Sequence, residues 1–245
     1  MCNAKFYHGG AIYVEGVNTT INNTEFKLCT ASGTESRGGA IDVNGNDTFI
    51  YNSGFDENRA VTGGAIYVSG HRALIESSSF KKDTSNNGGA IYILGEDAKI
   101  VDSDILNCNA TTNGGGIGVE GDGALIKGTT LDKCNSIKGA GGSIYISGEY
   151  TAIEDSNFTK STANTDGGAI LVAGNYTLIN GSYFEECTAK GATTINGGGA
   201  IYITGQQSHI SKSNFTNNKV TSNSACGGTI YIEGYNATID GSYFI

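Results

Sequence analysis

The 245-residue chain contains no proline and no tryptophan, and its single methionine is Met1. Because proline cannot donate to a sheet ladder, its absence suits strands that are hydrogen-bonded on both sides. No apolar run approaches the roughly 18–20 residues that a membrane-spanning helix needs, so no membrane insertion is expected within this chain. Residues 1–5 lack the basic and apolar regions of a signal peptide, and the export signal of a secreted protein would lie outside this sequence.

Positive charge is also scarce, with 15 Lys and Arg against 24 Asp and Glu and a formal net charge of −9. The basic residues are scattered along the chain. Nucleic acids demand a basic face to neutralise their phosphates, so nucleic-acid binding is not expected. Glycine is the residue in excess, because its 38 copies are roughly twice the usual share.

Many of these glycines belong to a repeat that occurs nine times. Each copy opens with Gly-Gly, a small residue and isoleucine; a corner glycine follows four residues later, a second isoleucine after nine and a large apolar residue after fourteen. The opening isoleucines are Ile12, Ile41, Ile66, Ile91, Ile117, Ile144, Ile170, Ile201 and Ile230, spaced 25 to 31 residues apart. All of this variation falls between the large apolar residue and the next Gly-Gly, which predicts a solenoid with loops on one edge.

The spacing within each copy is that of strands rather than helices. In residues 10–14 we expect Gly10, Ile12 and Val14 to point inward, and Ala11 and Tyr13 to point outward. The corner glycine is expected to turn the chain with a positive φ. The sequence therefore predicts an all-β, single-stranded right-handed parallel β-helix of about nine coils, in one domain over residues 1–245. Ladders of isoleucine, phenylalanine and Ser/Thr are expected inside it, and both ends fall in mid-coil, as in a segment of a longer array.

The repeat motifs resemble those of a known group of proteins. Gly-Gly-Ala-Ile begins at Gly9, Gly38, Gly63, Gly88, Gly167 and Gly198, and Phe-x-x-Asn spans Phe55 to Asn58 and Phe215 to Asn218. These motifs are similar to the repeats of chlamydial polymorphic outer-membrane proteins and of adhesin-like proteins from methanogenic archaea, over the whole chain. The chain departs from the chlamydial proteins in lacking their C-terminal membrane barrel. The resemblance implies extracellular or cell-surface display and adhesion to a protein or glycan of a host or neighbouring cell.

Recognition is expected in the variable segments before each Gly-Gly, such as residues 30–37 and 188–196, because only these are free to diversify. The alternative is a polysaccharide lyase, a glycoside hydrolase or a carbohydrate binder, since such proteins share this architecture. They use clustered carboxylates, and the best candidates here are the turn residues Glu96, Asp97, Asp122 and Glu149. These residues either hold a cation or are solvated turn residues of an acidic protein.

The acidic turn residues are expected to stand without a histidine or arginine, because His8, His71 and His209 fall in coils that we take to be distant. The motifs of polygalacturonases are absent. The sequence therefore gives no residue a catalytic, cofactor-binding or metal-binding role, no cofactor is expected, and we expect a protein that is not an enzyme. Ice or mineral binding is disfavoured, since no outward threonine array repeats.

Three other patterns need an interpretation. Asp56 and Glu57 precede Lys81 and Lys82 by one coil, which predicts cross-strand ion pairs. An outward tyrosine column either stacks on itself or binds a partner: Tyr13, Tyr67, Tyr92, Tyr145, Tyr202 and Tyr231. A cysteine column is expected to hold buried free thiols, although Cys108 and Cys134 fall within disulfide range by Cα distance: Cys2, Cys29, Cys108, Cys134 and Cys187. Cys226 lies outside the column and is expected to be exposed.

Nine Asn-x-Ser/Thr sequences are possible glycosylation sites, if the protein follows a secretory route that attaches glycans: Asn18, Asn22, Asn46, Asn109, Asn157, Asn175, Asn180, Asn214 and Asn236. The alternative is that Asn, Ser and Thr are simply abundant.

Overall fold

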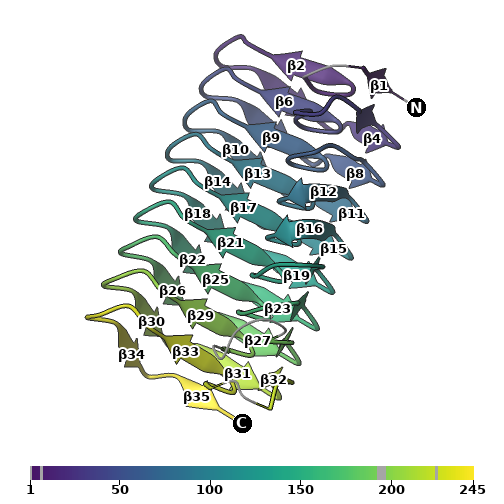
Figure 1. Ribbon diagram of the computed structural model, residues 1–245. Coiled ribbons are helices and arrows are strands. Elements are labelled where there is room, and N and C mark those ends of the chain that lie inside the picture. The colour runs from purple at the N-terminus through teal and green to yellow at the C-terminus, as the bar shows by residue number, and fades with distance from the viewer. Residues whose placement is uncertain (1, 6–7, 192–196, 224–225) are drawn as a thin grey trace.

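The chain winds into a right-handed parallel β-helix in a computed structural model, which describes residues 2–5, 8–191, 197–223 and 226–245. Successive coils stack along one axis, as Figure 1 shows. The described residues form strands and turns without a helix, and none of them builds a helix that is long and apolar enough to cross a membrane. Three of the sheets contain nine strands each within the described part of the chain. The predicted all-β helix of about nine coils is confirmed.

Each coil contributes one strand to each of sheets 1, 2 and 3. Sheet 1 contains β2 (Ile12–Val14), β6 (Ile41–Val43), β9 (Ile66–Val68), β13 (Ile91–Ile93), β17 (Ile117–Val119), β21 (Ile144–Ile146), β25 (Ile170–Val172), β29 (Ile201–Ile203) and β33 (Ile230–Ile232). Sheet 2 contains β3 (Thr20–Asn22), β7 (Phe49–Tyr51), β10 (Leu74–Glu76), β14 (Lys99–Val101), β18 (Leu125–Lys127), β22 (Ala152–Glu154), β26 (Leu178–Asn180), β30 (His209–Ser211) and β34 (Thr238–Asp240). Sheet 3 contains β4 (Glu25–Lys27), β8 (Gly54–Asp56), β11 (Ser79–Lys81), β15 (Asp104–Leu106), β19 (Thr130–Asp132), β23 (Asn157–Thr159), β27 (Tyr183–Glu185), β31 (Asn214–Thr216) and β35 (Tyr243–Phe244).

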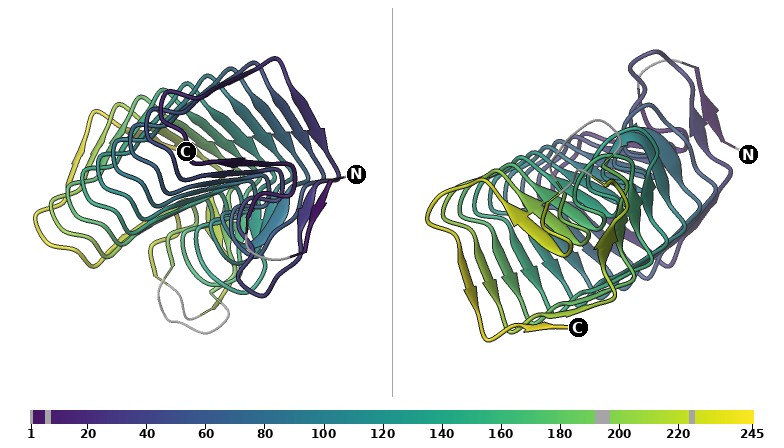
Figure 2. Two further views of the ribbon diagram at one scale, coloured as in Figure 1. Left: turned by 90° about the horizontal axis from the view of Figure 1, so that it is seen from above. Right: turned by 60° about the horizontal axis from the view of Figure 1, so that its bottom comes forward.

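A fourth, shorter sheet precedes the loops. Sheet 4 contains β12 (Thr84–Asn87), β16 (Asn109–Asn113), β20 (Asn135–Ser136), β24 (Thr162–Ala163), β28 (Thr188–Ala189) and β32 (Lys219–Val220). A separate pair, β1 (Asn3–Ala4) and β5 (Thr30–Ala31), is connected to it because Arg59 pairs in parallel with both Thr30 and Thr84. Sheet 4 and the loops that follow it lie on one side of the rod (Figure 2).

The interior consists of ladders of like residues, as predicted. Ile66 pairs with Ile41 and Ile91, and all three are fully buried. The rings of Phe158 and Phe184 stack with centroids 4.7 Å apart and planes 5° apart. Such stacking adds about 0.5–1.5 kcal/mol per pair beyond the burial of the rings. The ladder therefore stabilises the contact between coils and fixes their register.

The small residue of Gly-Gly-Ala-Ile belongs to the buried core in the later coils, so an outward position does not hold there, although Ala11 of the first coil is exposed as predicted. The backbone N–H groups of Ala65 and Ile66 both donate to the carbonyl oxygen of Ala90, at 2.8 and 3.0 Å. Strand alternation fails at this bend, because two successive residues share one acceptor. Ala65 and Ala90 are accordingly part of the hydrophobic core.

The corner glycine does not turn the chain with a positive φ, contrary to the prediction. The positive φ lies two residues later, for example 54° at Asp47 after Gly45 and 56° at Arg72 after Gly70. A Cβ atom on Gly70 would instead collide with the carbonyl oxygen of Gly45 in the preceding coil. The corner glycine is needed because the coils approach closely there, which no side chain allows.

Polar side chains inside the coil satisfy the turns that flank sheet 3. The Ser53 hydroxyl donates to the Tyr51 carbonyl at 2.7 Å and accepts the backbone N–H of Thr24 at 3.2 Å. Asn58 Oδ1 accepts the N–H of Cys29 at 2.9 Å, and its Nδ2 donates to the Phe26 carbonyl at 3.2 Å. The Asn of Phe-x-x-Asn thus satisfies the backbone of the preceding coil, which explains why that motif marks the fold.

Candidate functional site

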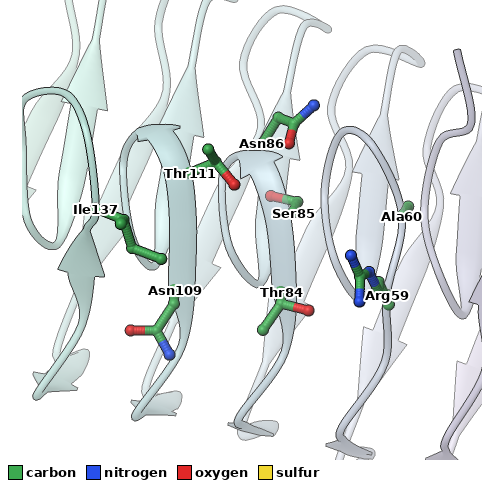
Figure 3. A pocket seen from close by; sticks show the side chains of 8 residues that line it. All are labelled: Arg59, Ala60, Thr84, Ser85, Asn86, Asn109, Thr111 and Ile137. Atoms are coloured by element: carbon green, nitrogen blue, oxygen red, sulfur yellow. The ribbon is translucent and has the colours of Figure 1, made fainter. Parts of the chain in front are cut away.

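The loop edge contains a polar hollow at the base of the variable segments. It measures about 250 Å³ and lies over β12, β16 and their neighbours. Arg59, Thr84 and Asn109 are in register across three successive coils and line one side of it (Figure 3). Asn135 Nδ2 donates to Asn109 Oδ1 at 2.9 Å, which continues the polar column into the next coil. Such a surface can donate and accept several hydrogen bonds to a ligand that lies along the rod.

The first variable segment borders this hollow. A second hollow of about 370 Å³ adjoins it, lined by residues 30–33, Ser36 and the Arg59 region. Residues 30–37, which were predicted to diversify, thus stand beside the polar column. In the other predicted segment, residues 192–196 lie outside the described residues, and only 188–191 can be placed. Sequence reasoning found the loop but not the column, because β12 and β16 follow no fixed motif.

A buried carboxylate, Asp42, lies where the tyrosine column is interrupted. Its side chain is 2% exposed, and one of its oxygens is 2.7 Å from His8 Nδ1. Burial raises the pKa of the Asp42 carboxyl, whereas His8 and Arg37 act to lower it. A pocket of about 160 Å³ faces Asp42 beside Tyr13, Arg37 and Asn44. The break in the tyrosine pattern at this position was the sequence signal for this cluster.

The tyrosine column is mostly covered. Tyr67 and Tyr92 are 4% and 9% exposed, and their rings stack 5.8 Å apart with planes 5° apart. The Arg37 guanidinium lies 4.9 Å above the Tyr67 ring. Burial, and then a hydrogen bond with Glu120, raise the pKa of Tyr92 far above its ordinary value. For these residues the column stacks on itself, which is the structural interpretation of the pattern.

The acidic turn residues act chiefly as acceptors for neighbouring coils. Asp122 Oδ1 accepts the backbone N–H of Glu149 at 2.8 Å, and Glu149 Oε1 accepts Asn175 Nδ2 at 2.8 Å. Within the described ranges, no three His, Cys, Asp or Glu side chains are arranged to hold a metal ion. Glu96 lies beside His71 of the preceding coil, and Asp97 lies beside Gly123 of the following coil.

The expectation that no histidine or arginine accompanies these acids is wrong. His71 Nδ1 accepts the backbone N–H of Glu96 at 3.2 Å and lies 3.7 Å from its carboxylate. His71 and Glu96 both follow a corner glycine, so the in-register stack makes them neighbours. Arg72 forms a two-pronged ion pair with Asp47, with both contacts at 2.8 Å. The turn therefore carries charges of both signs.

The predicted cross-strand ion pairs are partly present. Lys82 Nζ lies 3.0 Å from Glu57 Oε1, as expected. Asp56, however, pairs with Lys27 of the preceding coil at 2.8 Å instead of with Lys81. Such exposed pairs contribute about 0–1 kcal/mol each, so they do not mark a site.

Four members of the cysteine column are buried free thiols: Cys29, Cys108, Cys134 and Cys187. The fifth, Cys2, is exposed, so the expectation of burial is wrong for it, whereas Cys226 is exposed as expected. Cys134 Sγ lies 3.4 Å from the Ile105 carbonyl, and burial raises the pKa of Cys134 and Cys187 to about 12. These thiols are therefore poor nucleophiles at neutral pH.

The same column contains Asp83, which sequence reasoning missed. Asp83 is fully buried, and burial raises the pKa of its carboxyl to about 8, although hydrogen bonds from Asn58 act to lower it. Its Oδ1 accepts both the backbone N–H of Asn58 at 2.8 Å and its Nδ2 at 3.0 Å. Its place three residues after Phe80 was the available signal.

Several asparagines of the glycosylation sequences are accessible. Those with exposed residues are Asn18, Asn22, Asn157, Asn214 and Asn236. Asn46 is partly covered, and its Oδ1 accepts the backbone N–H of His71 at 2.9 Å. Attachment of glycans stays a prediction for the exposed positions.

No protein-family model matches this chain, and no curated protein matches it either.

Proposed function

We propose that the chain is a rigid, extracellular binding rod of the adhesin type, which recognises a protein or glycan of another cell through the loops before each Gly-Gly. The observation that carries this proposal is the restriction of length variation to that edge. Elsewhere the coil is fixed, because glycine columns and side-chain ladders leave no room for insertions. The loop edge also contains the polar hollow around Arg59, Thr84 and Asn109.

The motifs Gly-Gly-Ala-Ile and Phe-x-x-Asn support surface display through their resemblance to adhesin-like proteins. The roles of Ala65 and Asn58 in the coil show why these motifs mark the fold. Fold alone does not select a function, so the proposal needs a test at the loops themselves.

The test is a loop replacement that keeps the flanking pairs. Thr30 pairs with Arg59 and Arg37 pairs with Thr62, so residues 31–36 can be replaced by Ala60-Val61, the shorter connection of the next coil. Binding of labelled protein to a panel of microbial and animal cells is measured by flow cytometry. We expect the natural chain to bind at least one cell type and the replacement to lose most of that binding. Circular dichroism serves as the control for folding.

Unchanged binding after this replacement and after equivalent replacements at the other loops would refute recognition by the loop edge. The catalytic alternative makes a different prediction: release of reducing ends or unsaturated products from a polysaccharide panel with Ca²⁺. Loss of such release in Asp122→Ala would place an active site at the acidic turns. We expect no release from the folded protein.

A further inference from the structure

The turn between sheets 1 and 2 repeats one strained backbone position in every coil. The residue two places after the corner glycine has a φ between 54° and 70° in all nine copies. These residues are Asn18, Asp47, Arg72, Asp97, Gly123, Tyr150, Tyr176, Gln207 and Asn236. This left-handed conformation favours Gly, Asn and Asp and disfavours bulky side chains. Tyr150 and Tyr176 are the only aromatic residues in the described part of the chain that adopt it.

These two tyrosines form an exposed aromatic pair. Their ring centroids are 4.8 Å apart, with planes 7° apart, and they are 58% and 44% exposed. Tyr67 and Tyr92 of sheet 1, by contrast, are buried. One face of the Tyr150 ring lies against Tyr176. On the other side of Tyr150, the equivalent turn position of the preceding coil is Gly123, which has no side chain.

The gap at Gly123 is bounded on its far side by Asp97. A Cβ atom on Gly123 would collide with Asp97 Oδ1, so this carboxylate leans toward the gap. Neighbouring coils are about 4.8 Å apart, which is about the thickness of one stacked ring. The missing side chain at Gly123 therefore leaves a space beside Tyr150, and the Asp97 carboxylate borders it and reaches partly into it.

A groove continues from this gap along the rod. It measures about 390 Å³ and lies over Asp47, Phe49, Arg72, Leu74, Asp97 and Lys99. Phe49 and Leu74, at the start of strands β7 and β10, contribute apolar lining. The wall carries charges of both signs, including the Asp47–Arg72 ion pair. The groove reaches Gly123, and Tyr150 and Tyr176 occupy the next two positions of the same turn column, so we treat the groove and the tyrosine pair as one strip along the rod.

We propose that this strip binds a neutral carbohydrate chain, with one sugar ring in the gap at Gly123, stacked on Tyr150. The C–H face of a pyranose packs against an aromatic ring, and its hydroxyl groups hydrogen-bond to Asp97, Arg72 and Lys99. Because both signs of charge line the groove, neither a cationic nor an anionic chain gains a net electrostatic advantage. The site lies on the opposite side of sheet 1 from the loops, and it does not depend on the loop-mediated recognition proposed above.

Two substitutions remove the site while keeping the turn. Asn occupies the same column at Asn18 and Asn236, with φ values of 54° and 57°, so Tyr150→Asn and Gly123→Asn suit this backbone. The first removes the aromatic face, and the second fills the gap and displaces the Asp97 carboxylate from it. Tyr235→Asn is the matched control, because Tyr235 is an exposed turn tyrosine outside this column.

The measurement is isothermal titration calorimetry with hexamers of cellulose, xylan, starch and chitin, and with oligogalacturonate and chitosan oligomers as charged probes. We expect at least one neutral hexamer to bind the natural chain. Tyr150→Asn and Gly123→Asn should weaken its binding tenfold or more, and Tyr235→Asn should change it by less than twofold. The proposal is overturned if no neutral hexamer binds, if the two variants bind within twofold of the natural chain, or if a charged oligomer binds more tightly.

The two proposals fail separately. Replacement of residues 31–36 should leave binding of the neutral hexamer unchanged, and Tyr150→Asn should leave loop-dependent cell binding unchanged. Loss of hexamer binding in the loop replacement would transfer the carbohydrate site to the loop edge and refute its assignment to the turn.

Discussion

The rod has two contrasting edges, the turn between sheets 1 and 2 and the loops between sheets 4 and 1. Figure 1 shows them on opposite sides of the stacked strands. The turn keeps one backbone path in every coil and varies only its side chains, which include Arg72, Gly123 and Tyr150. The loops vary in length and path. A solenoid can therefore present diversity in two ways: as side chains on a fixed lattice, or as loops of free length.

The largest difference between the two edges is expected when one residue is inserted at each of them. An alanine inserted between Ser147 and Gly148 displaces the corner glycine from its contact with the carbonyl oxygen of Gly121 and shifts the following strand by one residue. A one-residue shift moves the inward set of side chains outward, and we expect a loss of more than about 5 kcal/mol in the free energy of unfolding.

The control is the same alanine inserted after Lys190 in a loop. Loop closure entropy grows slowly with length, so a change below about 0.6 kcal/mol is expected there. Urea unfolding followed by circular dichroism measures both variants. Equal losses at the two sites would show that the loops are as constrained as the turn.

A second prediction concerns the ladder that both edges depend on. Phe158 is fully buried between neighbouring coils, so Phe158→Ala should cost about 3–5 kcal/mol through the cavity that it leaves. Asn157 is the exposed neighbour on the same strand, and Asn157→Ala should change the free energy of unfolding by less than about 0.5 kcal/mol. A loss below about 1 kcal/mol for Phe158→Ala would contradict the stacked interior.

A third prediction separates buried from exposed carboxylates by pH. The pKa of Asp83 is about 8 in the folded protein, above its ordinary value of 3.8, so the folded state holds a proton that the unfolded state releases. Stability from this group is complete below about pH 4 and is lost as the pH rises toward 8, at about 1.4 kcal/mol per pH unit.

Asp83→Asn should remove this slope, because Asn58 already fills the same column with an amide. The variant should therefore be more stable than the natural chain at pH 8, with the difference shrinking toward pH 4. Chemical unfolding between pH 4 and 9 measures both proteins. Parallel pH profiles would show that Asp83 is not a buried proton-binding group.

The fold was predictable because its determinants recur at fixed spacing. Nine isoleucines in register and nine corner glycines left few alternatives to a stacked coil. The inward alanine at Ala65 and the positive φ at Asp47 were not predictable from alternation and glycine content, because each depends on how one coil meets the next.

The candidate sites were less predictable than the fold for the same reason. Tyr150, Tyr176 and Gly123 are separated by 26 or 27 residues, and only the stack brings them together. The acidic residues were noticed because they follow the corner glycines of three successive coils. His71 was misplaced because its distance along the chain was considered instead of its position after Gly70.

The smallest expected effect tests whether the turn between sheets 1 and 2 keeps its backbone path when a side chain in it is replaced. Tyr150→Asn relieves a left-handed tyrosine, worth about 1–2 kcal/mol, and loses a stacking contact with Tyr176 of about 0.5–1.5 kcal/mol. These terms oppose each other, so the free energy of unfolding should change by less than about 1 kcal/mol. Urea unfolding measures this change. The contrasting variant is Tyr67→Asn, because Tyr67 is a buried tyrosine in sheet 1. Its substitution should lower the free energy of unfolding by more than about 2 kcal/mol, as for other buried aromatic residues. A large loss for Tyr150→Asn would mean that the aromatic pair holds the turn together, and its exposure would then be incidental to packing. A small change would mean that the tyrosines are dispensable for folding, which leaves ligand binding as the reason for placing two large rings where the backbone favours asparagine.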